Sequence, residues 1–196
     1  MKLYLSQISG NSHKVRILLA LLNVAYDKVV LDLSKHEHKN PEFLKINPRG
    51  EVPVLEDDGA VIWDSGACLV YIARKHGGER WLPIAPAPMA EVMQWLALAA
   101  SEIQFGLQYA RRGVLQGRWT AGTLEQGHAI GRIALSVIEQ RLQKNDWLAL
   151  DHPTIADVAC FPYAETAPEA KIALDTYPNT VKWLERCRAL PGWPAR

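Results

Sequence analysis

The residues best placed to do chemistry lie in the segment 47–66. Val52-Pro53 opens a short apolar strand, Val54-Leu55, and Asp64-Ser65 stands directly before Cys68–Ala73, an apolar run typical of a helix. The free backbone N–H groups and the positive dipole end of a helix N-terminus favour an anion. Extended backbone, a proline and a helix start therefore lie close together, and this combination suits an extended peptide that carries carboxylates.

Alternating strand and helix signals over residues 1–77 would position this segment. Strands are expected at 3–5, 28–31, 54–55 and 61–63, and helices at 13–22, 40–46 and 68–75. Asp58-Gly59 is a strong signal for a two-residue hairpin turn between the last two strands. The order β-α-β-α-β-β-α predicts an α/β domain with a mixed sheet flanked by helices.

The rest of the chain predicts helices only. Closely spaced prolines predict a linker at 78–88, which separates a domain at 1–77 from an all-helical domain at 89–196. Thr154–Asp157 is a capping-box pattern that marks the start of one of the helices. Apolar residues recur at helical spacing in two further stretches: Val92, Trp95, Leu96, Ala99, Ile103 and Leu107, then Ile130, Ile133, Ala134, Val137 and Ile138.

The composition excludes several classes of function. The 196 residues carry 22 Lys and Arg against 21 Asp and Glu, and the net charge of +1 leaves no basic excess for nucleic acid. Three widely spaced cysteines form neither a CxxC pair nor a metal-ligand spacing, so no metal is expected. The first residues do not resemble a signal peptide, and no apolar run approaches the roughly 18 residues that a membrane span needs. We therefore expect a soluble cytoplasmic protein with neither nucleic-acid nor membrane partners.

Four groups of residues follow one another in a distinctive order: Ser9–Arg16, Asn47–Leu55, Asp64-Ser65 and Thr154–Asp157. In order and spacing, and over nearly the whole chain, they resemble cytosolic glutathione S-transferases of the serine-type, bacterial-like kind. The resemblance implies a thioredoxin-like N-terminal domain, an all-helical C-terminal domain and a homodimer. It also implies glutathione as co-substrate and a small electrophilic molecule as second substrate.

The resemblance assigns glutathione to five residues. Val52 would pair its backbone with the cysteinyl part, with Pro53 after a cis peptide bond, whereas an isolated X–Pro step would be an ordinary trans bond. Ser65 would hold the γ-glutamyl carboxylate and Asp64 the ammonium group. Alternatively, Ser65 is an N-cap with an acidic neighbour, and one serine could do both. His38 would bind the glycyl carboxylate, although it also lies in a polar run typical of a solvated surface.

The reaction needs the thiolate of glutathione, because the thiolate is the nucleophile. A hydroxyl that donates a hydrogen bond to the sulfur near a helix N-terminus would lower the pKa of the thiol. The family's spacing ahead of Val15 points to Ser9, with Ser12, expected to cap the helix, and Asn11, an amide donor, as alternatives. All three also fit a plain capping turn. Tyr4, expected to pack in the first strand, is a further alternative donor.

The second substrate would contact the first long helices of the helical domain. Tyr109 and Arg112 are the residues to which the resemblance points, and Arg111 and Trp119 lie in the same stretch. The Arg111-Arg112 pair could meet an anionic substrate or complement the dipole of a helix C-terminus. The second interpretation is favoured.

Together these features predict a glutathione transferase that conjugates the thiolate of glutathione to a small electrophile, as in detoxification. The alternatives are a non-catalytic glutathione-binding or protein-interaction member of the same fold, and a glutathione-dependent isomerase or dehalogenase. No cysteine occupies the turn 9–12, which argues against the branch of the family that forms mixed disulfides with glutathione. Cys68 is expected to be a buried structural thiol.

Overall fold

The computed structural model describes residues 1–117 and 119–195. The chain divides into two compact units, one formed by Met1–Gly78 with the residues from Pro191 onward and one formed by Glu79–Leu190. The boundaries 1–77, 78–88 and 89–196 stay a prediction, and residues 118 and 196 of the expected helical domain lie outside the described residues. Helix α4 (Gly78–Trp81) and the start of α5 (Pro86–Ala100) occupy the stretch expected to be a linker.

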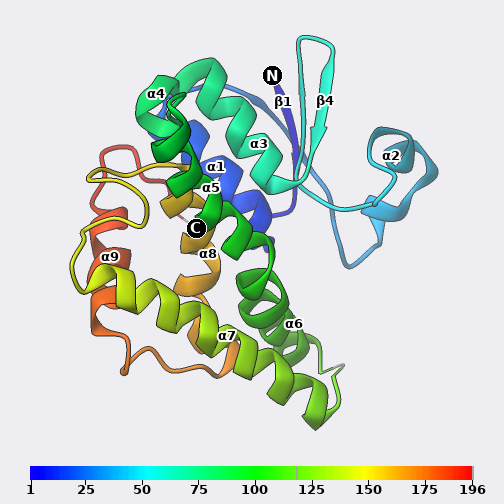
Figure 1. Ribbon diagram of the computed structural model, residues 1–196. Coiled ribbons are helices and arrows are strands. Elements are labelled where there is room, and N and C mark those ends of the chain that lie inside the picture. Colours follow the sequence, from blue (N-terminus) through cyan, green and yellow to red (C-terminus); the bar gives the residue numbers. More distant parts are fainter. Residues whose placement is uncertain (118, 196) are drawn as a thin grey trace. The chain divides into compact units, whose positions relative to one another are not determined.

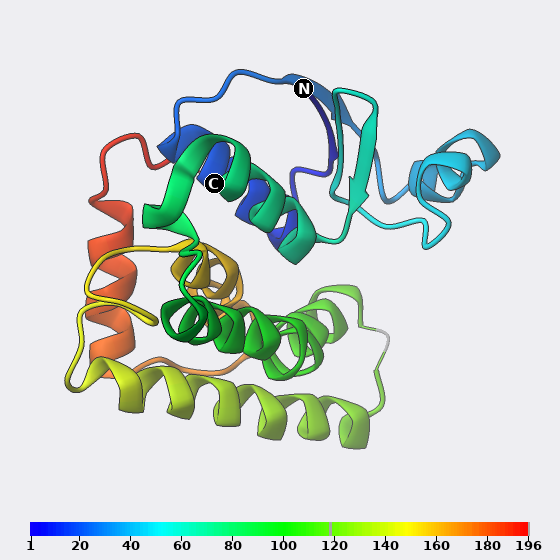
Figure 2. The same cartoon turned by 45° about the horizontal axis from the view of Figure 1, so that its top comes forward.

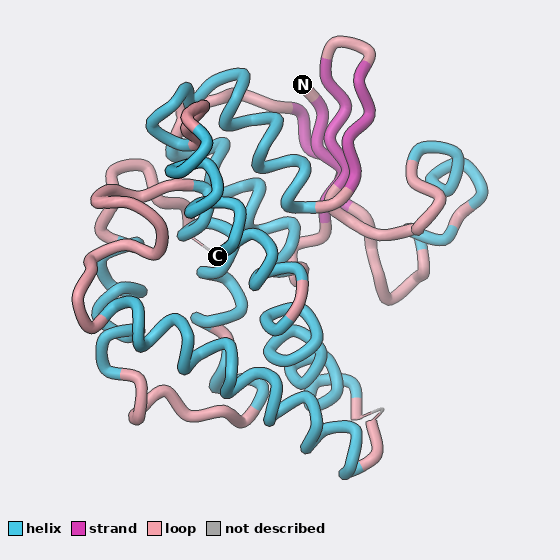
Figure 3. Tube along the Cα trace, viewed as in Figure 1, coloured by secondary structure: helices cyan, strands magenta, loops and turns pink. Residues whose placement is uncertain are grey.

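The first unit contains a four-stranded mixed sheet, as predicted. Its strands are β1 (Lys2–Leu5), β2 (Asp27–Val30), β3 (Val54–Asp57) and β4 (Ala60–Trp63), in the order β2-β1-β3-β4. β1 runs parallel to β2 and antiparallel to β3, and β3 and β4 form a hairpin, drawn in magenta in Figure 3. Asp58 and Gly59 both have positive φ, 48° and 80°, which confirms the predicted two-residue turn.

Helices cover both faces of this sheet. α1 (Gly10–Leu21) and α3 (Ser65–Ile72) lie side by side on one face, and α2 (Pro41–Ile46) lies on the other side (Figures 1 and 2). Side chains alternate along each strand, so Tyr4 and Val54 face a small core with Phe43 of α2. Leu3 and Leu55 are both 0% exposed and face α1 and α3. Helices therefore pack against both faces of the sheet.

The residues after Pro191 join the first unit rather than the helical one. Arg16 of α1 donates a 3.4 Å hydrogen bond from its guanidinium to the carbonyl of Ala195. Gly192 has a positive φ of 84° and lies so near the carbonyl of Ala20 that an added Cβ would be 3.2 Å from that oxygen. These contacts tie the segment to the second half of α1.

The second unit is all-helical in its described part. Its longer helices are α5, α6 (Tyr109–Gln116), α7 (Ala121–Leu142), α8 (Ile155–Glu165) and α9 (Pro178–Arg188). Every residue of α8 from Ile155 to Ala164 is buried, so this helix forms the centre of the unit. The predicted capping box is confirmed, because the Thr154 N–H donates to Asp157 and the Thr154 hydroxyl accepts from the backbone of α8. No described helix combines the length and apolar character needed to cross a membrane.

The predicted apolar faces are confirmed in one case and partly wrong in the other. The residues Val92, Trp95, Leu96, Ala99, Ile103 and Leu107 are all buried, although the expected continuous helix ends at Ala100 and resumes as a π-helical turn, η3 (Ile103–Gln108). On α7, however, Ile133 and Val137 are 56% and 40% exposed. The buried face of α7 runs instead through Gly131, Ala134, Leu135 and Ile138, at helical spacing.

A close approach of two backbones explains this shift on α7. A Cβ added to Gly106 of η3 would lie 2.4 Å from the backbone nitrogen of Gly131 on α7. Two glycines therefore let η3 and α7 pack with their main chains almost in contact. Since Gly131 carries no apolar side chain, the buried face of α7 is only partly marked by apolar residues.

Candidate functional site

Four chain segments meet at one end of the sheet of the first unit. Tyr4 and Trp63 both pair with Val54, and Leu5 pairs with Val30. Because β1 and β4 run antiparallel to β3, the ends of β1, β2 and β4 and the start of β3 lie at the same edge. The turn after β1, the loop after β2, Val52-Pro53 before β3 and the start of α3 after β4 therefore come together.

The turn after β1 contains the three candidates for contact with a thiol. Ser9 is the N-cap of α1, and its Oγ accepts a 3.2 Å hydrogen bond from the Ser12 N–H. Ser12 is 0% exposed, and its Oγ accepts from the Ser6 N–H at 3.2 Å. The expectation that Ser12 caps the helix is wrong, because Ser9 already occupies that position. Ser9 and Asn11 are half-buried, whereas Ser12 is fully buried.

The hydroxyl of Tyr4 makes its hydrogen bond within the sheet and not with the turn after β1. Its hydroxyl donates to Oε2 of Glu56 on β3 at 3.1 Å, and its ring packs against Phe43 with centroids 5.8 Å apart. Burial, and then the hydrogen bond to the Glu56 carboxylate, raise the pKa of Tyr4. The expected role of Tyr4 in strand packing is confirmed, and its hydroxyl is engaged within the sheet.

The start of β3 offers an open backbone edge. The Val52-Pro53 peptide bond is cis, as predicted. Val52 is only 9% exposed. Within the described residues, neither its N–H nor its C=O has a hydrogen-bond partner. A buried backbone group without a partner is uncommon in proteins, so this pair of groups is free to bind an extended chain.

The start of α3 places Asp64 and Ser65 beside that edge. Asp64 is the N-cap, since its Oδ1 accepts hydrogen bonds from Gly66 and Ala67 at 2.8 and 3.4 Å. The alternative that Ser65 caps the helix is therefore wrong, and Ser65 is the first helical residue. Adjacent side chains of similar capping preference left this choice open in the sequence.

Two features of this helix start are typical of binding sites. Asp64 has φ 79° and ψ 131°, a conformation that residues other than glycine rarely adopt and that clusters at functional sites. Ser65 is 7% exposed, and in the described part of the chain neither its hydroxyl nor its N–H has a hydrogen-bond partner. A hydroxyl and an N–H at a helix N-terminus form a donor pair for a carboxylate.

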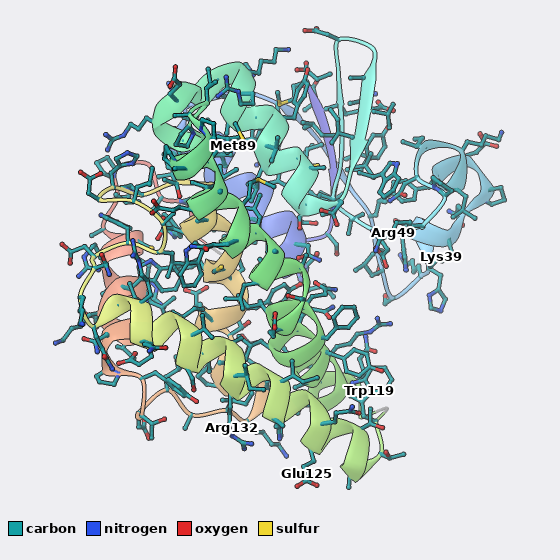
Figure 4. All side chains as sticks on the ribbon, in the orientation of Figure 1. Lys39, Arg49, Met89, Trp119, Glu125 and Arg132 are labelled. Atoms are coloured by element: carbon teal, nitrogen blue, oxygen red, sulfur yellow. The ribbon has the colours of Figure 1, made fainter. Side chains whose placement is uncertain are left out.

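The loop after β2 brings His38 and Lys39 to the segment before β3. His38 lies in a short 3-10 helix (Glu37–Lys39), half-buried, with its ring centroid 6.0 Å from that of His36. The Lys39 Nζ donates to the carbonyl of Arg49 at 3.0 Å, and Figure 4 shows these two labelled side chains on neighbouring segments. Gly50, with φ +57°, packs so closely on the His38 carbonyl that a Cβ would lie 2.8 Å from it.

Arg49 was not singled out in the sequence. Its guanidinium contacts Oε2 of Glu51 at 2.9 Å and Oδ2 of Asp64 at 3.8 Å. It also lies 5.7 Å from the centroid of the Trp63 ring on β4. The two opposite charges at Arg49 and Glu51, on either side of a glycine, could have indicated the ion pair between them. The ion pair between Arg49 and Asp64 could not be predicted in this way, because it depends on how the sheet brings the two segments together.

The predicted second-substrate residues lie in the helical unit. Tyr109 begins α6, and its ring stacks on Trp119 with centroids 4.5 Å apart, while the Trp119 Nε1 donates to the Tyr109 carbonyl at 2.9 Å. Arg112 is exposed, and its Nε donates to Gln116 at 3.3 Å. Arg111 forms an ion pair with Glu169 at 2.6 Å. The favoured dipole interpretation is wrong, because both arginines lie in the first half of α6.

The cysteines are structural in character. All three are buried, and burial, followed by the charge of Asp64, raises the pKa of Cys68 to about 12. The expectation for Cys68 is thereby confirmed. Among the described residues no group of three His, Cys, Asp or Glu side chains could hold a metal ion.

Comparisons with known proteins bear on both units. Residues 1–74 match the family model of the glutathione S-transferase N-terminal domain, and residues 128–191 match that of the C-terminal domain. The chain is 32% identical to a probable glutathione S-transferase, GSTF2, of Oryza sativa subsp. japonica, over 98% of this chain and 93% of that protein. It is 30% identical to the maleylacetoacetate isomerase of Pseudomonas aeruginosa over the same shares. It is 29% identical to the disulfide-bond oxidoreductase YfcG of Escherichia coli, over 93% of this chain and 87% of that protein.

Solved structures agree with the fold. A possible glutathione S-transferase from Rhodopseudomonas palustris superposes with a TM-score of 0.89 at 34% identity, over 99% of this chain and 88% of that one. The glutathione transferase URE2P6 from Phanerochaete chrysosporium, in complex with oxidized glutathione, gives 0.86 at 28% identity, over 97% and 91%. The thioredoxin-like and all-helical assignments are confirmed. The chain belongs to the glutathione S-transferase family.

Proposed function

We propose that this protein is a serine-type glutathione transferase, which conjugates the thiolate of glutathione to a small electrophile. The observation that carries the proposal is the convergence, at one end of the sheet, of an open backbone edge, a helix N-terminus with free donors and a half-buried serine on a second helix N-terminus. A structural relative that holds oxidized glutathione supports the choice of ligand.

Each part of glutathione has a counterpart among these groups. The cysteinyl backbone pairs with the N–H and C=O of Val52, as in the addition of a strand to a sheet. The γ-glutamyl carboxylate takes the N–H and hydroxyl of Ser65, and its ammonium group takes Oδ2 of Asp64, since Oδ1 caps the helix. The glycyl carboxylate lies toward His38. These contacts leave the thiol over the turn after β1.

Ser9 stabilises the thiolate in this proposal. Its Oγ already accepts from the Ser12 N–H, which directs the hydroxyl hydrogen away from the helix and toward a ligand. A hydrogen bond to a charged group contributes about 1.5–3 kcal/mol, and one pKa unit corresponds to about 1.36 kcal/mol. Ser9 would thus lower the pKa of the bound thiol by about one to two units, with Asn11 as the alternative donor. The thiolate then attacks the electrophilic carbon: the S–C bond forms as a leaving group departs with its bonding electron pair or, in an addition, as the π electrons move to the neighbouring carbon, which takes up a proton.

The test is a pH titration of the thiolate absorbance of bound glutathione in the ultraviolet. In the wild type we expect a thiol pKa well below the value of about 8.5 for a free cysteine. Ser9→Ala should raise it by one to two units, whereas Ser12→Ala should leave it within about half a unit. A lowered pKa that is indifferent to Ser9→Ala would move the role to Asn11. Binding without any lowering of the pKa would favour a non-catalytic glutathione-binding protein.

A glutathione-dependent isomerase is the second candidate, because one relative at 30% identity is a maleylacetoacetate isomerase. An isomerase adds the thiolate to its substrate and releases it again, so that glutathione is regenerated. Conjugation consumes one thiol for each product formed. Titration of the free thiol during turnover of an aryl halide and of a cis-configured unsaturated diacid therefore distinguishes the two activities. The interaction-only role predicts no turnover of either compound.

A further inference from the structure

We propose that Arg49 is a positioning residue for glutathione, which neutralises Glu51 and holds Asp64 in place beside the ligand. The inference rests on the proposed function and adds a residue that determines how tightly the peptide binds. Arg49 makes contacts with both carboxylates at once, at 2.9 Å to Glu51 and 3.8 Å to Asp64. These contacts join the segment before β3 to the start of α3.

The backbone around Arg49 is itself held in one conformation. Asn47 is 1% exposed, and its Oδ1 accepts from the Arg49 N–H at 3.1 Å while its Nδ2 donates to the Glu51 carbonyl at 2.8 Å. The Gly50 N–H donates to the Asn47 carbonyl at 2.8 Å. The turn thus presents the side chains of Arg49 and Glu51 on a fixed frame directly before Val52.

The charges of the ligand and of the neighbouring carboxylates explain why an arginine at this position would affect binding. Glutathione carries two carboxylates and one ammonium group, so its net charge is negative at neutral pH. Glu51 and Asp64 directly precede Val52 and Ser65, the residues proposed to contact the ligand. Asp64 is proposed to pair with the ammonium group of glutathione, whereas an uncompensated Glu51 would repel the two carboxylates of the ligand. The planar guanidinium can bridge two carboxylates, which the compact ammonium of a lysine does less well. Its position over the Trp63 ring adds a further restraint.

The expected effect is modest because the groups are half exposed. The side chains of Arg49, Glu51 and Asp64 are 50%, 59% and 47% exposed, respectively. Water and salt therefore screen the charges, and each pair of this kind contributes only a small stabilisation. With two pairs and a charged ligand, Arg49→Gln is expected to weaken glutathione binding about three- to tenfold.

Isothermal titration calorimetry, which measures the affinity for glutathione, tests the inference on four proteins: the wild type, Arg49→Gln, Glu51→Gln and the double variant. We expect Glu51→Gln to bind as tightly as the wild type or tighter, and the double variant to recover most of the affinity lost in Arg49→Gln. The loss should also shrink in about 1 M salt, where the Debye length falls to about 3 Å. Neither rescue nor salt dependence would result if Arg49 only supported the fold.

Arg186 provides a matched control in the helical unit. It forms an ion pair with Asp146 at 2.9 Å and lies 5.7 Å from the Trp147 ring centroid, much as Arg49 does with Glu51 and Trp63. Arg186→Gln should leave the affinity unchanged. Equal affinities of Arg49→Gln and the wild type would overturn the inference alone, as would a loss that neither salt nor Glu51→Gln relieves. A wild type that binds no glutathione would overturn the proposed function as well.

Discussion

Glu139 of α7 caps a helix to which it is not adjacent in sequence, and its replacement by glutamine should destabilise the helical unit. Its Oε1 accepts from the backbone N–H and the Nδ2 of Asn179 at 3.0 and 2.6 Å. Its Oε2 accepts from the N–H and the hydroxyl of Thr180, both at 2.8 Å. α9 starts at Pro178, and its N-cap, Tyr177, makes no side-chain capping bond. Glu139 therefore satisfies N–H groups that would otherwise lack partners.

The magnitude follows from what glutamine retains. Glu139→Gln keeps one oxygen and two of the four hydrogen bonds, but it replaces the second oxygen with a donor that faces donors. Loss of bonds to a charged acceptor costs about 1.5–3 kcal/mol each in buried sites, and loss of the charge near the helix N-terminus costs about 0.3–1 kcal/mol. With allowance for partial exposure, we expect a loss of about 2–4 kcal/mol in the free energy of unfolding. The melting temperature should fall by roughly 4–16 °C for a protein of this size.

The effect should depend on pH in a defined direction. Burial raises the pKa of Glu139, but the hydrogen bonds from Thr180 and Asn179 together outweigh it, so the pKa lies below its usual range. The stabilisation is therefore fully present above the unfolded-state pKa, about 4.3, and is lost as the pH falls through the lower folded-state value. Urea unfolding followed by circular dichroism between pH 7 and 3.5 should show the two proteins converging in acid.

Glu125, an exposed residue of the same helix that is labelled in Figure 4, provides the control. Glu125→Gln should change the free energy of unfolding by less than about 0.5 kcal/mol. If Glu139→Gln were as stable as Glu125→Gln at pH 7, the capping interpretation would be refuted. A large loss that stays constant down to pH 3.5 would show that shape, rather than the ionised carboxylate, stabilises α9.

Three further predictions concern packing, charge and reactivity. Gly106→Ala should cost about 1–3 kcal/mol of unfolding free energy, because its Cβ would meet the backbone of α7, whereas Gly122→Ala, with open space around it, should be neutral or slightly stabilising in the same urea assay. Asp57→Asn should lower stability at neutral pH, because the hydrogen bond from Lys75 holds the pKa of Asp57 below its usual range. The difference should begin to shrink as the pH falls below the unfolded-state value of about 3.9 and should vanish below the lower folded-state pKa, so a difference that stays constant throughout the acid range would contradict it. Cys68 should react with a disulfide thiol reagent only after unfolding in urea, and rapid labelling of the native protein would contradict its burial.

Features with a local cause could be predicted from the sequence. The hairpin at Asp58-Gly59 and the capping box at Thr154–Asp157 each depend on a few neighbouring residues, and both are confirmed. The mixed sheet followed from the alternation of strand and helix signals. Capping by Asp64 rather than Ser65 did not, because neighbouring residues with similar preferences differ only in the φ and ψ that the whole fold imposes.

Features that join distant segments could not be predicted. Arg49 meets Asp64 only because β3 and β4 form a hairpin that returns the chain to the same end of the sheet. The buried face of α7 was misplaced because Gly131 packs closely without an apolar side chain, so that Ile133 and Val137 dominated the periodicity. In both cases the missing information is the partner surface, which a single segment does not contain.

Because the segment from Pro191 onward packs on α1, the first unit can complete its packing only after the rest of the chain has been synthesised. N-terminal domains generally fold first, while the ribosome adds about 5–20 residues per second. Met1–Gly78 must wait for the roughly 110 residues of Glu79–Leu190 to be translated before the contacts near Ala20 and Arg16 can form, a delay of about 6–20 s at those rates. During that interval the second half of α1 lacks this cover, and a nascent chain stalled within the helical unit would expose it to chaperones and proteases.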